Sequence, residues 1–276
     1  MFDIMLRKKK KVTTTHEVKR YTLHSDYLER DVVIDIYLPN ELPAEPALLL
    51  MNDGQDLEKM PFTSIFDSLL SEKAIVPMIC VGIHCGADRK LEYGTAFSAD
   101  YNNRGRKAGL YNKFIFDEFM PWLREILNIH SFSEKSFAGF SLGALSALDI
   151  VWNHASEFKK VGVFSGSLWW RRKAYEDGYD ETKDRLMHLQ MKTGQAPLWL
   201  KFFLECGTLD ETSDRNNNGV IDSIDDVMDM IAILKEKGFP DDAITYYEIT
   251  DGRHDVATWA KALPVFLRWG WPLLEN

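Results

Sequence analysis

One short segment of this sequence has the pattern of a nucleophilic turn. Gly139-Phe140-Ser141-Leu142-Gly143 has the form G-x-S-x-G, and it stands between an apolar run and a helical pattern. In a sharp strand-to-helix turn the serine takes a strained backbone conformation, and the residues two positions away must be small. The turn presents the serine Oγ at a helix N-terminus, where the next backbone N–H points to the same place. The pattern predicts Ser141 as a nucleophile; the alternative is a helix N-cap serine after a glycine turn.

A serine nucleophile needs a base that takes its proton and an acid that orients the base. His254 follows the last expected strand and precedes a helical pattern, which suits a base on a loop above a sheet. Asp210 follows the preceding strand by only a few residues, and we assign it as the acid, with Glu211 and Asp214 as competitors. The other histidines fit structural or surface positions, although His84 also ends a strand.

The segment 214–225 has the spacing of a calcium-binding loop. Side-chain oxygens recur at positions 1, 3, 5 and 12, a glycine stands at 6, and position 7 would bind through its carbonyl. The predicted ligands are Asp214, Asn216, Asn218, Val220 and Asp225. The absence of an entering helix and the Asp at position 12 resemble the calcium loop of dockerin modules. We expect a structural Ca²⁺ that stiffens the loop carrying Asp210; Mg²⁺ fits less well, and the alternative is an Asx-rich turn.

The hydrophobic pattern predicts the elements that position these residues. Two alternating segments, 18–25 and 30–39, predict a hairpin. Continuous apolar runs predict strands buried on both faces, as in a parallel sheet. These runs are 46–52, 76–84, 135–140, 160–165, 199–206 and 244–250. Helical patterns occupy 64–73, 110–127, 142–155 and 223–238. Pro121 predicts a kink in the second helix, and Gly238 suits the end of the last.

Strands that alternate with helices predict an α/β fold. The expected architecture is a mostly parallel, twisted sheet with helices on both faces and an antiparallel hairpin at the N-terminus. The order Ser, Asp, His along the chain is that of the α/β-hydrolase fold.

The loop after the third strand is the second part of the expected oxyanion hole. This strand ends in Asn52-Asp53-Gly54-Gln55, and in the α/β-hydrolase fold the corresponding loop lends a backbone N–H. We therefore assign the N–H groups of Gln55 and Leu142 as oxyanion donors. Gly54 would let the backbone approach the substrate closely. The alternative is a plain turn, for which Asn-Asp-Gly is also well suited.

Composition and length narrow the class of protein. The 276 residues show no linker, repeat or low-complexity tract, which predicts one domain over 1–276 with the loop 214–225 as an insertion. The net charge of −9 argues against nucleic-acid binding.

No apolar stretch approaches the ~20 residues of a membrane helix. No secretory apolar region follows the first lysines, so we expect a cytoplasmic protein. Three cysteines without metal spacing predict buried thiols and no disulfide framework.

Several short segments together match one known family. They are LLLMNDGQDL, EYGTAF, AGFSLGALSAL, VFSGSLWW, ECGTLDE and GRHDVATW. Over residues 30–270 the sequence resembles the esterase D-like "putative esterase" family of α/β-hydrolases, which includes ferric enterobactin esterases, feruloyl and acetyl-xylan esterases and S-formylglutathione hydrolase. The resemblance implies roles for Ser141, Asp210, His254, Gln55 and Leu142 as assigned above. It also implies that Ser167, Trp169 and Trp170 border the substrate pocket, with core packing as the alternative for the two tryptophans.

The expected activity is hydrolysis of a carboxylic ester through an acyl-enzyme, with no cofactor for catalysis. The expected substrate is a siderophore-type or carbohydrate-linked ester. Basic side chains available to an anionic siderophore are Arg104, Arg106, Lys107, Arg171 and Arg172. Two alternatives stay open, namely an acyltransferase that uses the same triad and a non-catalytic binding protein of this fold. The protein is expected to be a monomer or a small homo-oligomer.

Overall fold

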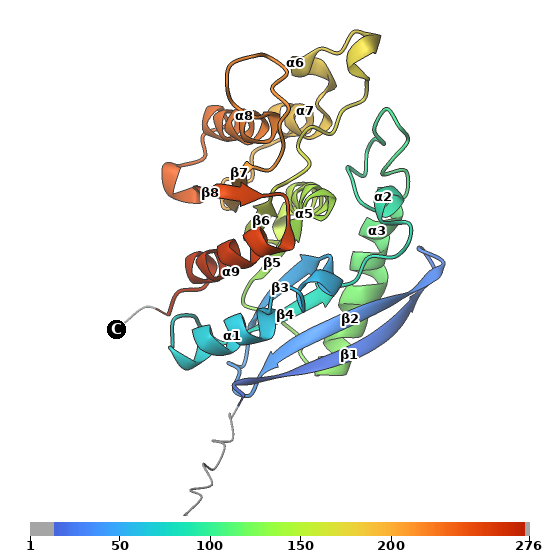
Figure 1. The fold of residues 1–276 in the computed structure, drawn as a ribbon. Coiled ribbons are helices and arrows are strands. Elements are labelled where there is room, and N and C mark those ends of the chain that lie inside the picture. Colours follow the sequence, from blue (N-terminus) through green and yellow to red (C-terminus); the bar gives the residue numbers. More distant parts are fainter. Residues whose placement is uncertain (1–13, 274–276) are drawn as a thin grey trace, which may run out of the picture.

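A single sheet runs through the middle of the computed structural model, which describes residues 14–273 (Figure 1). Its strands are β1 (His16–Ser25), β2 (Arg30–Pro39), β3 (Ala47–Asn52), β4 (Met78–Ile83), β5 (Lys135–Phe140), β6 (Lys160–Phe164), β7 (Lys201–Leu209) and β8 (Ile244–Arg253). Their order in the sheet is β1-β2-β4-β3-β5-β6-β7-β8. β1 pairs antiparallel with β2, and β2 antiparallel with β4. All the other neighbouring strands are parallel, which confirms the predicted fold class, including its N-terminal hairpin.

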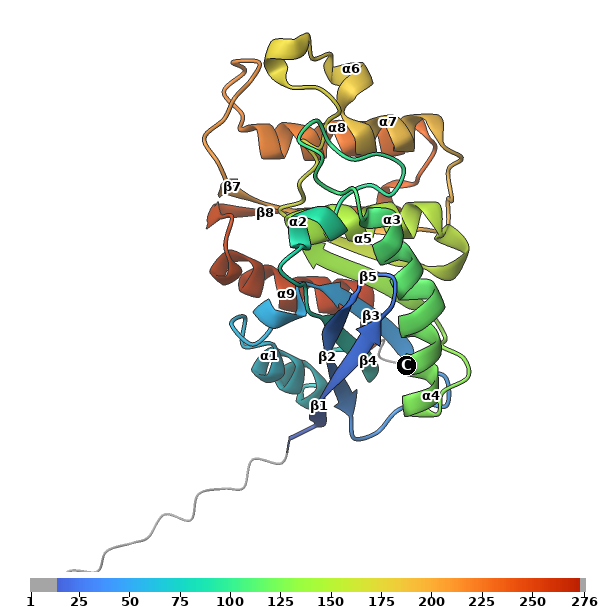
Figure 2. The same cartoon turned by 90° about the vertical axis from the view of Figure 1, so that its right-hand side faces the viewer.

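Helices cover both faces of this sheet (Figures 1 and 2). The longer helices are α1 (Phe62–Ser71), α5 (Leu142–Asn153), α8 (Asp222–Glu236) and α9 (Val256–Gly270). The shorter ones are α2 (Arg89–Glu92), α3 (Ala108–Lys113), α4 (Met120–Leu127), α6 (Glu181–Asp184) and α7 (Leu186–Thr193). Single 3₁₀ turns are η1 (Gly54–Asp56), η3 (Ala155–Glu157), η4 (Tyr175–Asp177) and η5 (Asp241–Ala243).

Two hydrophobic cores form because β3 is apolar at every position before Asn52. Leu49 and Met51 pack in the core that contains α1 and α9, whereas Leu48 and Leu50 pack in the core that contains α5 and α8. Side chains of a strand alternate between faces, so a continuous apolar run supplies both cores. Burying each such side chain contributes about 1.5–3 kcal/mol, and together these contacts hold the parallel strands in register.

The predicted helix 110–127 forms as two α-helices with a π-helical segment, η2 (Phe114–Phe119), between them. The N–H of Met120 donates to the carbonyl of Ile115, five residues back. Pro121 has no N–H, and in a regular α-helix its ring would clash with the carbonyl four residues back. A wider π turn relieves this conflict, so the irregularity lies before Pro121.

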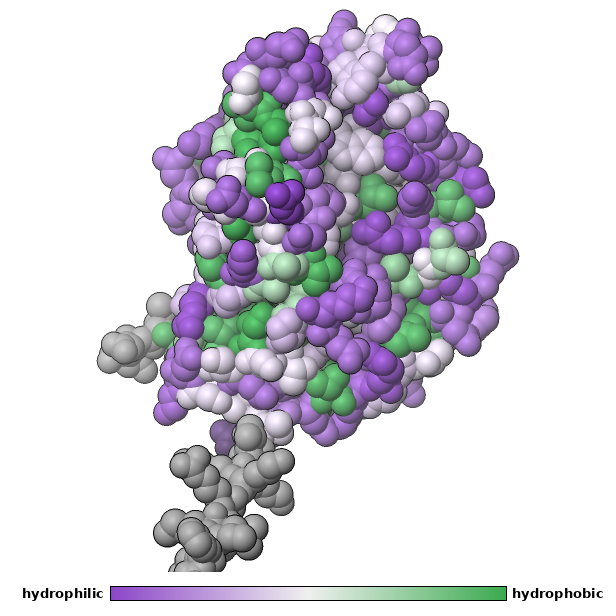
Figure 3. All heavy atoms as spheres, viewed as in Figure 1, coloured by the Kyte–Doolittle hydropathy of each residue, from purple (hydrophilic) through white to green (hydrophobic). Residues whose placement is uncertain are grey.

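Other sequence predictions can be compared with the structure directly. Gly238 ends α8 with φ 90°, in the left-handed conformation expected of a glycine at that place. The three cysteines are free; Cys80 and Cys206 are buried and Cys85 is partly exposed. No helix within residues 14–273 has the length and apolarity needed to cross a bilayer. On the face shown in Figure 3, hydrophobic residues are scattered among hydrophilic ones.

Candidate active site

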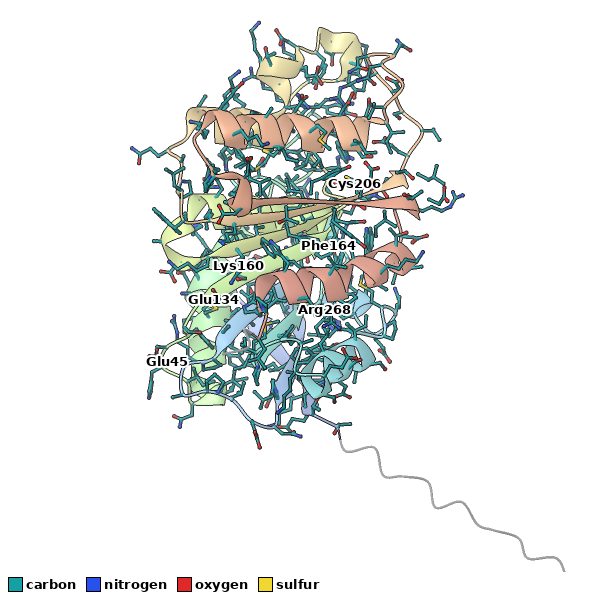
Figure 4. The ribbon with its side chains drawn as sticks, turned by 90° about the vertical axis from the view of Figure 1, so that its left-hand side faces the viewer. Glu45, Glu134, Lys160, Phe164, Cys206 and Arg268 are labelled. Atoms are coloured by element: carbon teal, nitrogen blue, oxygen red, sulfur yellow. The ribbon has the colours of Figure 1, made fainter. Side chains whose placement is uncertain are left out.

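The predicted site residues follow four different parallel strands at one edge of the sheet. They are Gln55 after β3, Ser141 after β5, Asp210 after β7 and His254 after β8. Figure 4 shows the direction of the parallel strands: β6 runs from Lys160 to Phe164. The site residues lie at the end of the sheet that contains Phe164. The carboxyl ends of parallel strands are where α/β folds place their ligand sites, so the topology gathers these residues.

The turn that carries Ser141 is strained in the way the sequence pattern predicts. Ser141 has φ 56° and ψ −120°, which is uncommon for a residue other than glycine. Its N–H donates to the carbonyl of Phe164 at 2.9 Å, and its carbonyl accepts from the N–H of Ala144 at 3.1 Å. A Cβ on Gly139 would overlap the backbone of Gly143. The two glycines are therefore a packing requirement of this turn.

The hydroxyl of Ser141 is partly exposed and lies beside Ser167. The two Oγ atoms are 3.4 Å apart, and the N–H of Ser167 donates to the carbonyl of Ser141 at 3.2 Å. No hydrogen bond joins Ser141 to His254 within the described residues. Catalytic hydrogen bonds are often long in the absence of substrate and shorten in the complex.

Asp210 and His254 act on each other through their charges. Neither carboxylate oxygen of Asp210 has a hydrogen-bond partner within residues 14–273. Burial raises the pKa of Asp210, while the Ser165 hydroxyl and the charge of His254 act in the opposite direction. Desolvation lowers the pKa of His254. The negative charge of Asp210 raises this pKa, and the positive charge of Arg89 lowers it further. Asp210 is thus an acceptor with free oxygens next to an imidazole that is neutral near pH 7.

Glu211, the competing acid, has different neighbours. Burial raises its pKa, and the charges that raise it further are those of Asp222 and Asp226; His254 is not among the groups that act on it. These contacts favour Asp210 as the partner of the histidine.

A second carboxyl lies close to Asp210, and the sequence analysis did not single it out. Glu205 of β7 is completely buried. The hydroxyl of Ser165 lies 3.5 Å from it and accepts a hydrogen bond from the indole N–H of Trp259 at 2.9 Å. Burial, together with the negative charge of Asp210, raises the pKa of Glu205 to about 8. Glu205 is therefore mostly protonated at neutral pH.

The predicted oxyanion donors have free N–H groups. Leu142 is the first residue of α5 and Gln55 lies in η1; neither backbone N–H donates a hydrogen bond within the described part of the chain. Gly54 also has a packing role. A Cβ on Gly54 would overlap the backbone of Gly82 in β4, so this glycine is needed for close packing against the sheet, and its approach to a substrate stays a prediction.

A cavity of about 660 Å³ lies between the segment after β6 and the loop after β7, and its lining residues do not include Ser141, Asp210 or His254. Trp169 and Arg171 line one side of it, and Glu211 and Asp214 line the other. Trp170, the second predicted pocket tryptophan, is completely buried and packs against Gly94 and therefore does not border the pocket.

Arg171 differs from three of the other basic candidates in having no ion pair, and from Arg106 in being buried. Arg104, Lys107 and Arg172 form ion pairs with Asp100, Asp88 and Asp184, respectively. Arg171 is 9% exposed and has no carboxylate partner within residues 14–273. Its guanidinium lies 4.0 Å from the ring centre of Tyr175 and 4.7 Å from that of Tyr101. A buried cation held by aromatic rings beside a cavity suits an anionic or aromatic ligand.

The side chains of the predicted calcium loop converge. The carboxylate of Asp225 accepts hydrogen bonds at 2.9 Å from the amides of both Asn216 and Asn218. Asp214 accepts from the backbone N–H groups of Asn218 and Gly219 at 3.1 and 2.9 Å. Val220, the remaining predicted ligand, donates its N–H to Asn218 Oδ1 at 2.8 Å. Within residues 14–273, no group of three or more His, Cys, Asp or Glu side chains is placed to hold a metal.

Comparison with known proteins gives one family and a set of similar folds. The family described as "Putative esterase" matches residues 25–269. A ferulic acid esterase is 18% identical with a TM-score of 0.68, over 93% of this chain and 97% of that one. The enterochelin esterase from Shigella flexneri is 21% identical with a TM-score of 0.71, over 91% of this chain but only 57% of that one. A siderophore hydrolase from Aspergillus nidulans is 17% identical with a TM-score of 0.68, over 94% and 97%. No curated protein matches the sequence.

Proposed function

Because this chain belongs to the "Putative esterase" family and is a carboxylic ester hydrolase, we propose that it is a serine esterase whose triad is Ser141, His254 and Asp210. The observation that carries the proposal is the strained backbone of Ser141 at the N-terminus of α5. A partly exposed hydroxyl at a strand-to-helix turn, with a free N–H on the following Leu142 and another on Gln55 after β3, suits acyl transfer to serine.

In the proposed reaction, His254 takes the proton of Ser141 as Oγ attacks the carbonyl carbon of the ester. Asp210 accepts the Nδ1–H of the imidazole and stabilises the imidazolium that forms. The N–H groups of Gln55 and Leu142 donate to the tetrahedral oxyanion. The imidazolium then protonates the leaving alcohol, which departs from the acyl-enzyme. Water repeats the attack and releases the carboxylic acid.

We propose a siderophore-type ester, with anionic or aromatic groups near the scissile bond, as the substrate class. The cavity lined by Trp169, Arg171 and Glu211 is within the size range of small-molecule sites. Trp169 offers a face for stacking, and the unpaired guanidinium of Arg171 offers a charge. An acetylated carbohydrate, whose acyl group has neither a charge nor an aromatic ring, would leave Arg171 without a partner.

A panel of four esters tests this function: p-nitrophenyl acetate, a feruloyl ester, acetylated xylan and ferric enterobactin. We expect hydrolysis of p-nitrophenyl acetate in water alone, and the highest kcat/KM with an aromatic or anionic ester. Turnover that requires an added alcohol or sugar acceptor would contradict hydrolysis and identify an acyltransferase. A preference for acetylated xylan would contradict the proposed substrate class.

We further propose that the loop 214–225 binds a structural Ca²⁺. The residues present fit this ion, because two carboxylates, two amide oxygens and one backbone carbonyl are hard oxygen ligands. Asp214, Asn216, Asn218 and Asp225 would hold the ion with the carbonyl of Val220. Arg215 already anchors the loop through ion pairs with Asp222 and Asp226. The ion would stiffen the segment between Asp210 and α8 and would take no part in the reaction.

Removal of calcium is expected to lower the Tm. Saturation at about 100-fold above Kd contributes about 2.7 kcal/mol, which corresponds to a shift of about 5 °C for a chain of this size. Thermal unfolding in millimolar CaCl₂ and in excess EGTA measures the shift. The Asp225→Asn variant should lose the response, whereas Asp241→Asn, outside the loop, should keep it. An unchanged Tm in EGTA with no metal in elemental analysis would end the proposal.

A further inference from the structure

We propose that Arg89 is a positioning residue for the oxyanion hole. It neutralises Asp53 at the N-terminus of the nucleophile helix, and it ties the loop after β3 to the nucleophile turn. The inference rests on the proposed function, because it assumes that an oxyanion forms between Gln55 and Leu142.

A single guanidinium contacts both halves of the oxyanion hole. The Nε of Arg89 donates to Asp53 Oδ1 and its Nη2 to Oδ2, each at 2.7 Å. The same Nη2 also donates to the carbonyl of Phe140 at 3.2 Å. Asp53 precedes Gly54-Gln55, and Phe140 precedes Ser141. Movement of one half relative to the other would therefore break a bidentate, charge-assisted contact.

Asp53 lies where its charge matters for catalysis. It is 1% exposed and has φ 60°, which is uncommon for a residue other than glycine. A Cβ on Gly143 would lie 2.5 Å from Asp53 Oδ2, so the carboxylate packs directly against the first turn of α5. Asn52, its neighbour, donates to the carbonyl of Gly143 at 2.8 Å. The carboxylate and the expected oxyanion thus share one helix N-terminus.

The Asp53 carboxylate and the oxyanion would repel each other at the N-terminus of α5. The partial positive charge of a helix N-terminus stabilises an anion, and a second anion nearby repels the first more strongly in a buried site than in water. With Arg89 in place, the Asp53–Arg89 pair is neutral and the N–H groups remain available to the oxyanion. Without Arg89, the buried carboxylate of Asp53 would oppose the transition state.

Arg89 also acts on the base. The charged groups that face His254 are Asp210 from the loop after β7, Arg89 from α2 and its neighbour Asp255. The charges of Asp210 and of Glu205 in β7 also act on each other. The positive charge of Arg89 disfavours imidazolium, so it lowers the pKa of His254. Because the general base must be neutral, removal of Arg89 moves the acid limb of the pH profile to higher pH.

A second ion pair on α2 provides a matched control. Arg30 makes a bidentate contact with Glu92 at 2.8 and 2.7 Å, and Glu92 is completely buried, much like Asp53. This pair joins α2 to the start of β2 and touches neither the nucleophile turn nor η1. Arg30→Gln therefore breaks a contact of the same kind away from the site.

The test compares Arg89→Gln, Arg89→Lys, Arg89→Gln with Asp53→Asn, and Arg30→Gln, using p-nitrophenyl acetate. We expect Arg89→Gln to lower kcat by about 100-fold with little change in KM, the loss typical of a missing oxyanion donor. Adding Asp53→Asn to Arg89→Gln should raise kcat again by about tenfold, because it removes the opposing charge. Arg89→Lys keeps the charge and should lose less, and Arg30→Gln should stay within about threefold of the unchanged protein.

The pH profile of kcat/KM separates this role from a purely structural one. We expect the acid midpoint to rise in Arg89→Gln and to stay in place in Arg89→Lys. If Arg89→Gln does not fold, the double variant, which buries no charge, should show the same rise relative to Arg89→Lys. The proposal is overturned if Asp53→Asn restores nothing and the midpoint does not move. Full activity in Ser141→Ala would instead overturn the proposed function, and this inference with it.

Discussion

Replacing Ser141 with alanine is expected to lower kcat for ester hydrolysis by at least about 10³-fold, because no other group forms the acyl-enzyme. The same change should abolish covalent labelling by a fluorophosphonate probe, which reacts only with an activated serine. The Tm should stay close to that of the unchanged protein, because the strained turn is held by its backbone hydrogen bonds and by the two glycines rather than by the hydroxyl.

Ser167→Ala is the matched control for this prediction. Its hydroxyl lies 3.4 Å from that of Ser141, so it is the nearest alternative nucleophile to test. Ser167→Ala should still be labelled, since Ser167 lies outside the strained turn. Labelling that persists in Ser141→Ala and is lost in Ser167→Ala would place the nucleophile on the other serine and contradict the proposed triad.

Asp210→Asn is expected to lower kcat by about 10³- to 10⁴-fold with little change in KM. An amide holds the imidazole in the wrong tautomer and does not stabilise the imidazolium, which is the effect known from other serine triads. The variant should fold at least as well as the unchanged protein, because the two unpartnered carboxylate oxygens cost free energy in the native state. Steady-state kinetics and thermal unfolding measure both effects.

Glu211→Gln is the control that separates the two neighbouring acids. The charges of Asp222 and Asp226 shift the pKa of Glu211, and His254 does not. The kcat of the Glu211→Gln variant should therefore change by less than about tenfold. A loss in Glu211→Gln as large as that expected for Asp210→Asn would identify Glu211 as the acid. Unchanged kcat in both variants would leave His254 without an acid and contradict the triad.

Local patterns predicted most of the fold. Each apolar run became a strand, because burial on both faces selects apolar residues at every position regardless of which strands pair. The strand-to-helix turn at Ser141 was also visible, since the need for glycine on each side arises within five residues. The prediction failed where helices are short, as in α6 and α7, because four and eight residues are too few to show a periodic apolar pattern in the segment 171–198.

The pocket was predicted less well, because it depends on side chains from distant strands. Trp169 and Trp170 are neighbours with the same chemistry, yet one borders the cavity and the other packs against Gly94. The packing of Gly54 against Gly82 of β4 was likewise invisible in the sequence, because the two glycines lie in different segments of the chain. Glu205 lies within a predicted apolar strand, so nothing in its local pattern marks a carboxyl close to Asp210.

The sequence by itself determined the α/β architecture, the strand ends on which Ser141, Asp210 and His254 lie, and the spacing of the loop 214–225. These features depend on hydrophobic periodicity and on backbone conformations that a few adjacent residues impose. Only the tertiary structure showed that the charge of His254 acts on Asp210, that Trp169 borders a cavity while Trp170 is buried, and that Arg89 joins Asp53 to the carbonyl of Phe140. Burial and charge act through space, and they depend on contacts between residues that are far apart in the chain.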